Sequence, residues 1–342
     1  MTVTDLRDTD KILDIEGLGL GPALKKAIPA FGGKASHYGA LTEIGPDVPV
    51  PMAYAVPVYY YRKHMELNGL DKVVDSMLDD EAFKSDPAVR FEKLAELQEM
   101  IRNSPVDPAF EALLMTKLAT DYPGQRMRFR SSTNAEDLDG FTGAGLYTSL
   151  SGDPNDPKDP IMDAVRGVWA SIWKYKAFEE RSYRSIDHKS VGMALLSHPA
   201  FPEEESNGVA LTANIFDTSG LEPGFYINAQ IKGVSVVLPD AGVTTDQMIY
   251  HYQMPGQPIV FLSHSNLIPP GETVLTTAQT YELGKALSAI HQYFFKLYGP
   301  PPGNPLEFYA MDVEWKFDSS DGGPAKVVIK QARPHPGWGL NK

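Results

Sequence analysis

Glycine and lysine near the start of this chain are grouped in a way that suits an anionic ligand. The group is Gly32-Gly33-Lys34, which precedes a pattern of apolar residues at helical spacing. Two glycines let a backbone approach an anion closely, and the lysine adds a positive charge. The sequence Gly-Gly-Lys is common in proteins, and most lysines in this setting are solvated on the surface. This group alone therefore indicates a phosphate site only weakly.

A second group is the run RSSTNAEDLDGFTGAGLY over residues 130–147. The alternation of arginine and apolar residues over 126–130 predicts a strand with its cations on one face. Arg130 ends this strand and a glycine-rich loop follows, which together suit a clamp for a polyphosphate. The alternative is an ordinary surface loop, in which the two serines and Glu136 form a helix cap.

A third group lies late in the sequence, where Glu314 is followed by Gln331 and Arg333. Alternating residues over 311–317 and 326–331 predict a hairpin, joined by a segment rich in Asp, Ser and Gly. Oxygen atoms of Glu314 and Gln331 on adjacent strands can share one hard cation, and an arginine beside them can hold phosphate oxygens. The alternative is a polar cross-strand pair at a sheet edge, which these residues alone favour.

The elements that must position these groups are mainly helical at first and mainly β later. Helical spacing predicts helices over residues 21–28, 59–102, 109–120, 161–184 and 277–297. Short apolar runs predict further strands over residues 191–196, 208–214 and 225–230, with loops and short strands over 239–272. We therefore predict an α+β fold of two lobes. Residues 1–190 carry the first two groups, and residues 191–342 carry the hairpin.

The composition disfavours several classes of site and partner. The 342 residues are 42% hydrophobic, which suffices for a two-lobed protein with a substantial core. A formal net charge of -13 argues against nucleic acid as a partner, and the lack of cysteine excludes disulfides and thiolate metal sites. Residues 1–17 lack the apolar core of a signal peptide, and no run approaches the roughly 18 apolar residues of a membrane helix. We expect a cytoplasmic protein with no membrane partner.

Taken together, the motifs resemble the ATP-binding domain of the phosphoenolpyruvate synthase and pyruvate phosphate dikinase family. The likeness spans roughly residues 30–335, and its motifs follow one another in the family's order. They are FGGKAS from Phe31, RSSTNAEDL from Arg130, FTGAG from Phe141, NGVALT from Asn207, and DVEW from Asp312 with QARP from Gln331. The second motif is similar to the glucan water dikinase branch. The resemblance implies a two-lobed ATP-grasp-like nucleotide-binding fold, with ATP and Mg²⁺ as cofactors.

The resemblance also implies a role for each matching residue that would meet the phosphates. Lys34 and Arg130 are expected to contact the ATP phosphates, and Gly143 in the glycine-rich segment to offer its backbone N–H. Arg333 is expected to stabilise the phosphate being transferred. Because the chemistry needs neutralised charge rather than covalent help, Arg333, Arg130 and Lys34 are the expected catalytic residues.

The remaining expected ligands come from the hairpin and from the strand near the adenine. Glu314 and Gln331 are expected to hold Mg²⁺, and both also count as nucleotide-site residues. His198 stands where the family usually has a glutamine beside the adenine. The segment over 227–240 also departs from the family, because it lacks the usual glycine–glutamate element and carries Lys232.

Members of the family split ATP to AMP and pass a phosphoryl group to a histidine on a swivelling domain. From there it reaches pyruvate, a glucan, water or a drug. The carrier motif is similar to Thr-Ser-His-Ala-Ala, and the one superficial match here, Ser197-His198-Pro199-Ala200, falls within the ATP-binding region. The resemblance therefore implies a carrier domain in the same longer polypeptide or in a partner, and leaves the final acceptor open.

Two other functions fit the sequence. A non-catalytic ATP-binding module with a regulatory or scaffold role is indicated by His198 and by the altered segment over 231–240. An ATP-grasp ligase that forms an acyl phosphate is the third possibility. Such a ligase releases ADP, whereas the dikinase reaction releases AMP, so the nucleotide product separates them.

Overall fold

The structure is a computed structural model that describes residues 2–135, 145–217, 219–300, 308–320 and 322–335. The chain divides into two compact units, each built on its own antiparallel sheet. The first unit comprises residues 1–36 and 52–200, and the second comprises residues 37–51 and 201–342. Helices combined with two separate antiparallel sheets confirm the predicted α+β class.

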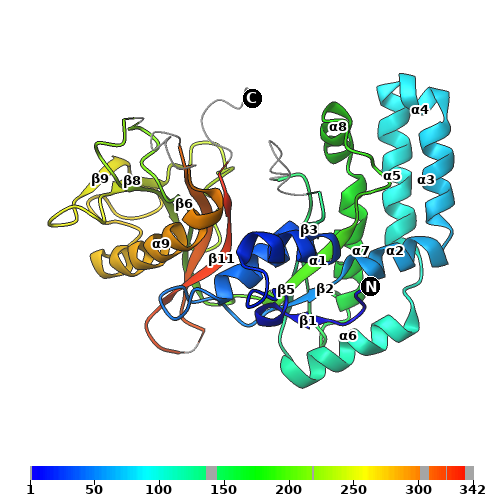
Figure 1. Ribbon diagram of the computed structural model, residues 1–342, viewed down its shortest axis with the longest axis horizontal. Coiled ribbons are helices and arrows are strands. Elements are labelled where there is room, and N and C mark those ends of the chain that lie inside the picture. Colours follow the sequence, from blue (N-terminus) through cyan, green and yellow to red (C-terminus); the bar gives the residue numbers. More distant parts are fainter. Residues whose placement is uncertain (1, 136–144, 218, 301–307, 321, 336–342) are drawn as a thin grey trace. The chain divides into compact units, whose positions relative to one another are not determined.

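The first unit contains a five-stranded sheet with the strand order β1-β2-β5-β3-β4. Its strands are β1 (Arg7–Asp8), β2 (Tyr54–Val56), β3 (Met127–Thr133), β4 (Leu150–Gly152) and β5 (Met193–Pro199). Its helices are α1 (Leu20–Thr42, whose last turns belong to the second unit), α2 (Val58–Leu67), α3 (Leu70–Asp79), α4 (Glu81–Ser85), α5 (Pro87–Asn103), α6 (Pro108–Asp121), α7 (Ile161–Ala170) and α8 (Tyr175–Tyr183). Figure 1 shows α3, α4 and α5 grouped together, with α5 lying next to α7.

Alternation along β3 gives the first sheet two different faces. Met127 and Phe129 are fully buried in the core of the unit, where α7 packs on β3 and β5. Arg128 and Arg130 point to the opposite face, because successive side chains of a strand alternate. The predicted strand with cations on one face is therefore confirmed. It continues to Thr133, so that residues 131–133, which the sequence predicted as loop, belong to the strand.

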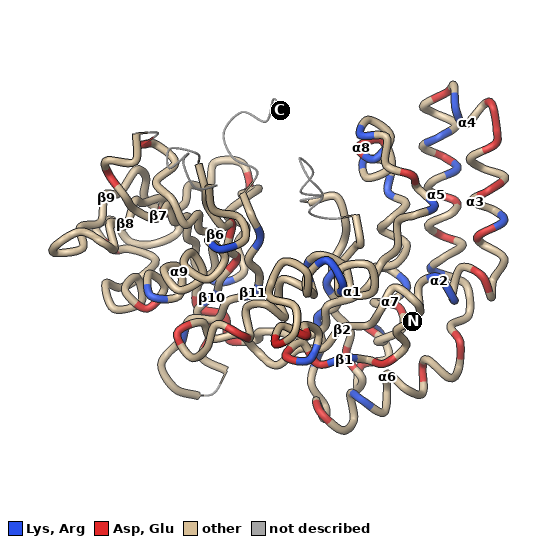
Figure 2. The backbone as a smooth tube through the Cα atoms, in the orientation of Figure 1, with Lys and Arg blue, Asp and Glu red and all other residues tan. Residues whose placement is uncertain are grey.

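Local signals divide the helical stretch predicted over 59–102 into four helices. Gly69, in the left-handed region with φ 65°, separates α2 from α3. Asp80 and Asp86 then cap α4 and α5 by accepting backbone N–H groups, and Pro87 begins α5. Acidic and basic side chains are interspersed along α3, α4 and α5 (Figure 2), as expected for helices with one solvated face.

The helix predicted over 161–184 is also interrupted. A 3-10 turn at Ser171–Trp173 separates α7 from α8. The Trp173 indole donates a 2.9 Å hydrogen bond to the hydroxyl of Tyr61 on α2. This bond satisfies the indole N–H of a side chain that is otherwise buried among apolar groups.

The second unit contains a six-stranded sheet with the order β11-β10-β6-β7-β8-β9. Its strands are β6 (Glu204–Leu211), β7 (Phe225–Ile231), β8 (Asp246–Tyr250), β9 (Ile259–Ser263), β10 (Met311–Asp318) and β11 (Lys326–Pro334). Helix α9 (Thr277–Tyr298) packs against β10 and β11, and begins with a capping box formed by Thr276 and Gln279. The helix predicted over 277–297 and the predicted hairpin are both confirmed.

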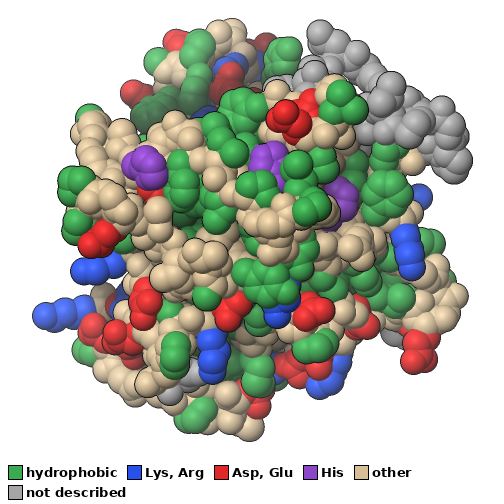
Figure 3. Space-filling view, turned by 90° about the vertical axis from the view of Figure 1, so that its left-hand side faces the viewer, with side chains coloured by type: hydrophobic (Ala, Val, Ile, Leu, Met, Phe, Trp, Pro, Cys, Tyr) green, Lys and Arg blue, Asp and Glu red, His purple; other side chains and the backbone are tan. Residues whose placement is uncertain are grey.

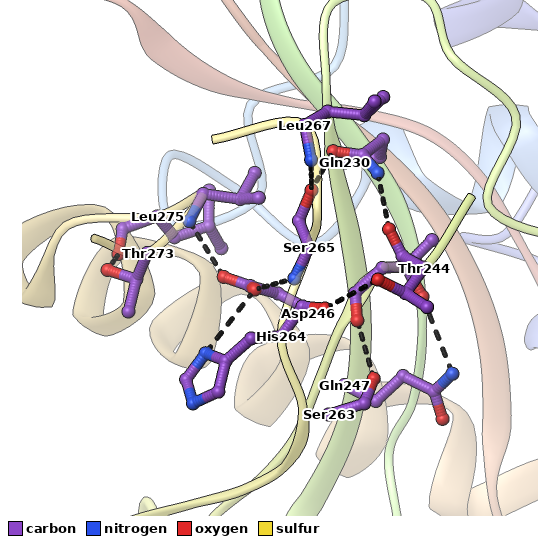
Figure 4. A network of polar contacts seen from close by, with 12 residues as sticks. Gln230, Thr244, Asp246, Gln247, Ser263, His264, Ser265, Leu267, Thr273 and Leu275 are labelled. Atoms are coloured by element: carbon purple, nitrogen blue, oxygen red, sulfur yellow. Dashed lines mark hydrogen bonds and ion pairs between the residues drawn. The ribbon is translucent and has the colours of Figure 1, made fainter. Parts of the chain in front are cut away.

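A buried carboxylate holds the segment that joins β9 to α9. Asp246 is fully buried at the start of β8 and accepts 2.7 Å hydrogen bonds from the backbone N–H groups of Ser265 and Val274. His264 approaches the same carboxylate at 3.7 Å (Figure 4). The Ser265 hydroxyl continues the network to the side-chain oxygen of Gln230 on β7. Asp246 therefore has a structural explanation, namely the anchoring of this connection.

The surface of the second unit is mixed in character. The space-filling view shows apolar side chains interspersed with acidic and basic ones, with a few histidines among them (Figure 3). The exposed apolar side chains include Val260 and Leu262 on β9. Single apolar side chains of this kind are normal on a folded protein and indicate no interface by themselves. Among the described helices, none has the combination of length and apolar character needed to cross a bilayer.

Candidate functional site

The Gly32 turn and the RSS segment pack directly on each other within the first unit. Helix α1 is interrupted at Gly32, whose φ is 75°. A Cβ atom at this position would lie 2.2 Å from the carbonyl oxygen of Ser132. The Ser132 hydroxyl donates to the carbonyl of Phe31 (2.7 Å) and accepts from the N–H of Ala35 (2.9 Å). Ser132 thus fixes the chain on both sides of the interruption, and only glycine fits between them.

Lys34 joins the same arrangement through its ammonium group. Its Nζ atom donates a 2.9 Å hydrogen bond to the carbonyl oxygen of Ser131 on β3. Arg130 immediately precedes Ser131 in that strand. The structure therefore brings the lysine of the first sequence motif to the strand that carries the arginine of the second. Gly143, the third expected phosphate contact in this part of the chain, lies outside the described residues.

His198 on β5 stands directly opposite Arg128 on β3. Cross-strand neighbours share a face of the sheet, so His198 lies on the same face as Arg128 and Arg130, away from α7. The His198 ring is buried, and its Nδ1 atom lies 2.8 Å from the carbonyl oxygen of Pro199. Burial, reinforced by the neighbouring Arg130 and Arg126, lowers the pKa of Arg128. This face is therefore electropositive, which suits an anion.

The hairpin of the second unit places its polar residues side by side. Glu314 on β10 pairs directly with Gln331 on β11, and Asp312 pairs with Arg333. The register shifts immediately after Glu314, so that Trp315 pairs with Ile329. A β-bulge of this kind re-aims the side chains beside it and is frequent next to functional sites.

Arg333 is held by a carboxylate that sequence reasoning missed. Its Nε and Nη2 atoms donate to the same Oδ2 atom of Asp312, at 3.0 and 2.7 Å. Asp312 therefore orients the guanidinium that the resemblance assigns to the transferring phosphate. The signal was present in the DVEW motif, because Asp312 and Glu314 are two residues apart in a strand and must share a face.

The NGVALT motif owes its glycine to the packing of the hairpin. Gly208 on β6 pairs with Trp315, and a Cβ atom on Gly208 would lie 2.2 Å from the indole Cζ2 atom. The threonine of the motif, Thr212, accepts a 2.8 Å hydrogen bond from the N–H of Met311 and lies 3.0 Å from the His291 ring. Both motif residues thus secure β10, the strand that carries Glu314.

The side-chain oxygens of Glu314 and Gln331 have the chemistry that a magnesium ion bound together with a nucleotide would require. Within the described ranges, no group of three or more His, Asp or Glu residues is placed to hold a metal ion. Mg²⁺ commonly takes only one or two protein oxygen ligands and completes its shell with phosphates and water. A paired carboxylate and amide, as in Glu314 and Gln331, match that requirement.

Comparison with known proteins decides the family. The family model of the pyruvate phosphate dikinase AMP/ATP-binding domain matches residues 28–342. The chain belongs to this family. Phosphoenolpyruvate synthase from Aeropyrum pernix is 22% identical over 95% of this chain, and a probable phosphoenolpyruvate synthase from Pyrococcus abyssi is 25% identical over 91%. Phosphoenolpyruvate synthase from Escherichia coli strain K12 is 23% identical over 90% of this chain.

Membership of the pyruvate phosphate dikinase AMP/ATP-binding domain family confirms the resemblance inferred from the motifs. It supports ATP as the ligand and phosphotransfer as the class of chemistry. The chain spans 43%, 42% and 40% of the lengths of these three relatives. The reaction of a whole relative is therefore a proposal for this chain.

Proposed function

We propose that this chain is the ATP-binding part of a dikinase-type phosphotransferase. It binds ATP and promotes its cleavage to AMP: the β-phosphoryl group passes to a histidine on a separate swivelling domain, and the γ-phosphoryl group leaves to water or to inorganic phosphate. The family match over residues 28–342 carries this proposal. The packing of the Gly32 turn on β3 supports it, because two motifs that are 97 residues apart become neighbours. The fold that we propose for the nucleotide-binding region is ATP-grasp-like.

Lys34 and Arg130 have the chemistry to bind the polyphosphate. Phosphoryl transfer passes through a state with charge spread over the phosphate oxygens, so that fixed cations stabilise it. Lys34 is fixed by Ser131 and Arg130 is held in a regular strand. Gly143 would add a backbone N–H group. His198, on the same face of β5, is proposed to line the adenine.

Glu314 and Gln331 are proposed to hold Mg²⁺. When bound, the ion would neutralise phosphate charge and hold the phosphates in one geometry. Arg333 would contact the phosphate being transferred. Its ion pair with Asp312 fixes the guanidinium before the nucleotide arrives, which lowers the entropy cost of that contact.

We propose that the carrier histidine lies on a domain outside this chain, and that the final acceptor is a separate molecule. Because the chain matches less than half of each relative named above, we propose a carrier domain in the same longer polypeptide or in a partner protein. We expect the reaction to take place in the cytoplasm.

A binding titration tests the nucleotide part of the proposal. We expect the 342-residue chain to bind ATP in the presence of Mg²⁺ in isothermal titration calorimetry. Lys34→Met should weaken binding by about 10–100-fold, because a charge-assisted contact is worth about 1.5–3 kcal/mol. Lys26→Met is the matched control, since the Lys26 side chain is 68% exposed. Equal affinities of the two variants would contradict the role of Lys34.

A non-catalytic ATP-binding module is the second candidate. His198 in place of the usual glutamine and the altered segment over 231–240 favour it. Such a module would bind ATP without forming AMP in the presence of any carrier domain. An acyl-phosphate-forming ligase would instead release ADP.

A further inference from the structure

We propose that Arg128 is a second phosphate-binding arginine of β3, and that it contacts the phosphate of the AMP half of bound ATP. This inference rests on the proposed function, because it assumes a nucleotide whose terminal phosphates meet Lys34 and Arg130. It adds a residue that none of the sequence motifs contains. The ligand class is a nucleoside phosphate.

The position of Arg128 in the strand suits this role. Arg128 and Arg130 are two residues apart in β3, so their side chains share one face and lie about 7 Å apart along the strand. Two arginines with this spacing can meet different phosphates of one nucleotide. Arg128 also stands opposite His198 on β5, at the end of the strand away from Ser131 and Lys34.

Among the residues that the structure describes, no carboxylate compensates the charge of Arg128. Its one hydrogen bond to another described residue runs from Nη1 to the hydroxyl of Ser151 on β4, at 3.2 Å, and no described carboxylate forms an ion pair with it. Arg126, by contrast, pairs with Asp159. A half-buried guanidinium between two like charges is unfavourable, and burial and those charges lower the pKa of Arg128. A bound phosphate would offset this cost.

The direction of β3 indicates which phosphate of the nucleotide Arg128 would contact. Lys34 bonds to Ser131, so a nucleotide whose terminal phosphates meet Lys34 and Arg130 has them towards the carboxyl end of β3. Its AMP half then points towards the start of β3, where His198 is expected to line the adenine. Arg128 lies at this end of the strand, directly opposite His198, so the phosphate nearest the adenosine is the one within its reach. The phosphate that it reaches is the one that remains in AMP after cleavage.

The test is to compare the affinities of ATP, AMP and adenosine for three variants of the full chain by calorimetry. We expect Arg128→Met to weaken the binding of ATP and of AMP by a similar factor of about tenfold or more, and to leave the affinity for adenosine unchanged. Arg130→Met should weaken the binding of ATP far more than that of AMP. Arg126→Met is the matched control, since Arg126 immediately precedes β3 and already pairs with Asp159, and it should change none of the affinities.

Each other outcome is decisive. An unchanged affinity of Arg128→Met for AMP would overturn the proposal, and so would an equal loss of adenosine binding, which indicates a structural role alone. If Arg128→Met does not fold, Arg128→Lys replaces it in the experiment, because lysine keeps the positive charge but loses the planar guanidinium. Arg128→Lys should still weaken the binding of AMP and leave the affinity for adenosine unchanged. Failure of the wild-type chain to bind ATP would instead contradict the proposed function itself.

Discussion

Gly32 shows how a residue without a side chain can fix a site. Its φ of 75° and the closeness of Ser132 leave no room for a Cβ atom. We expect Gly32→Ala to lower the free energy of unfolding by about 2–4 kcal/mol, because a close contact with backbone adds to the strain of a positive φ. Urea denaturation of the purified variants measures this difference.

Gly19→Ala is the matched control for that experiment. Gly19 has a similar φ of 74°, yet a Cβ atom there would meet nothing within 4 Å. Its substitution should cost only about 1 kcal/mol of backbone strain. If the two variants lose equal stability, the contact between the Gly32 turn and Ser132 does not have the importance assigned to it.

His188 gives the first unit a pH-dependent contribution to stability. Its ring stacks on Phe178 and lies 3.2 Å from the Arg181 Nε atom. Burial, and then the charge of Arg181, lower the pKa of His188 from 6.5 to about 4. Between these values the unfolded chain binds a proton that the folded chain does not, so stability falls as the pH falls through this window.

We therefore expect His188→Asn to reduce the difference in unfolding free energy between about pH 7.5 and about pH 5, by roughly 1–2 kcal/mol after allowing for the partial exposure of the ring. Denaturation curves of both proteins at both pH values measure it. Burial also lowers the pKa of His64 and His291, so part of the dependence should remain. An unchanged pH dependence would contradict the assignment to His188.

Sequence reasoning reached some of the candidate functional residues and missed others, for physical reasons. The motifs could be recognised in the sequence by their residues and their order, and five expected site residues lie in them: Lys34, Arg130, Glu314, Gln331 and Arg333. The roles of these residues stay predictions. Asp312 was missed because its ion pair depends on the register between two strands. Arg128 was seen only as part of an alternating strand, because the lack of an acidic partner for it among the described residues is a property of the folded state.

At the scale of the element, the close packing of β6 on β10 depends on one pair of residues, Gly208 and Trp315. The Trp315 indole covers Gly208, and a Cβ atom there would also lie 2.3 Å from the Asn228 carbonyl oxygen. We expect Gly208→Ala to cost about 2–4 kcal/mol of unfolding free energy. Gly233→Ala is the control, since its nearest neighbour, an oxygen of Glu204, would be 3.9 Å away.

A double variant separates the two contacts of Gly208. In Gly208→Ala combined with Trp315→Phe, the smaller ring relieves one contact, whereas the backbone contact with Asn228 stays. The two losses should therefore be less than additive in guanidinium denaturation. Strict additivity would show that the indole does not constrain residue 208.

Most elements were predictable because their signals are local. Helix α9 and the β10–β11 hairpin carry strong periodicity and clear boundaries. The short strands β1 and β4 were missed, since two or three residues give no periodic signal. The interruption at Ser171–Trp173 was missed because it depends on packing with α2 rather than on a proline or glycine.

At the scale of the whole molecule, membership of the family supports ATP as the ligand and phosphotransfer as the class of chemistry. Membership of the pyruvate phosphate dikinase AMP/ATP-binding domain family, and synthase relatives that extend well beyond the matched length, support a division of labour between nucleotide activation and phosphoryl acceptance. The sequence alone predicted this division from the lack of a carrier motif. Because no part of the described chain shows an acceptor, the acceptor must be identified from the products of transfer.

The nucleotide product is the most direct test of the proposed dikinase function. The chain would be incubated with Mg²⁺, the histidine-bearing domain of a phosphoenolpyruvate synthase and ATP labelled in its β-phosphate, and the products separated by chromatography. We predict that AMP forms only when the carrier domain is present, that the label moves to that domain, and that Lys34→Met abolishes both. Tight ATP binding without AMP, or the release of ADP in its place, would contradict a dikinase function.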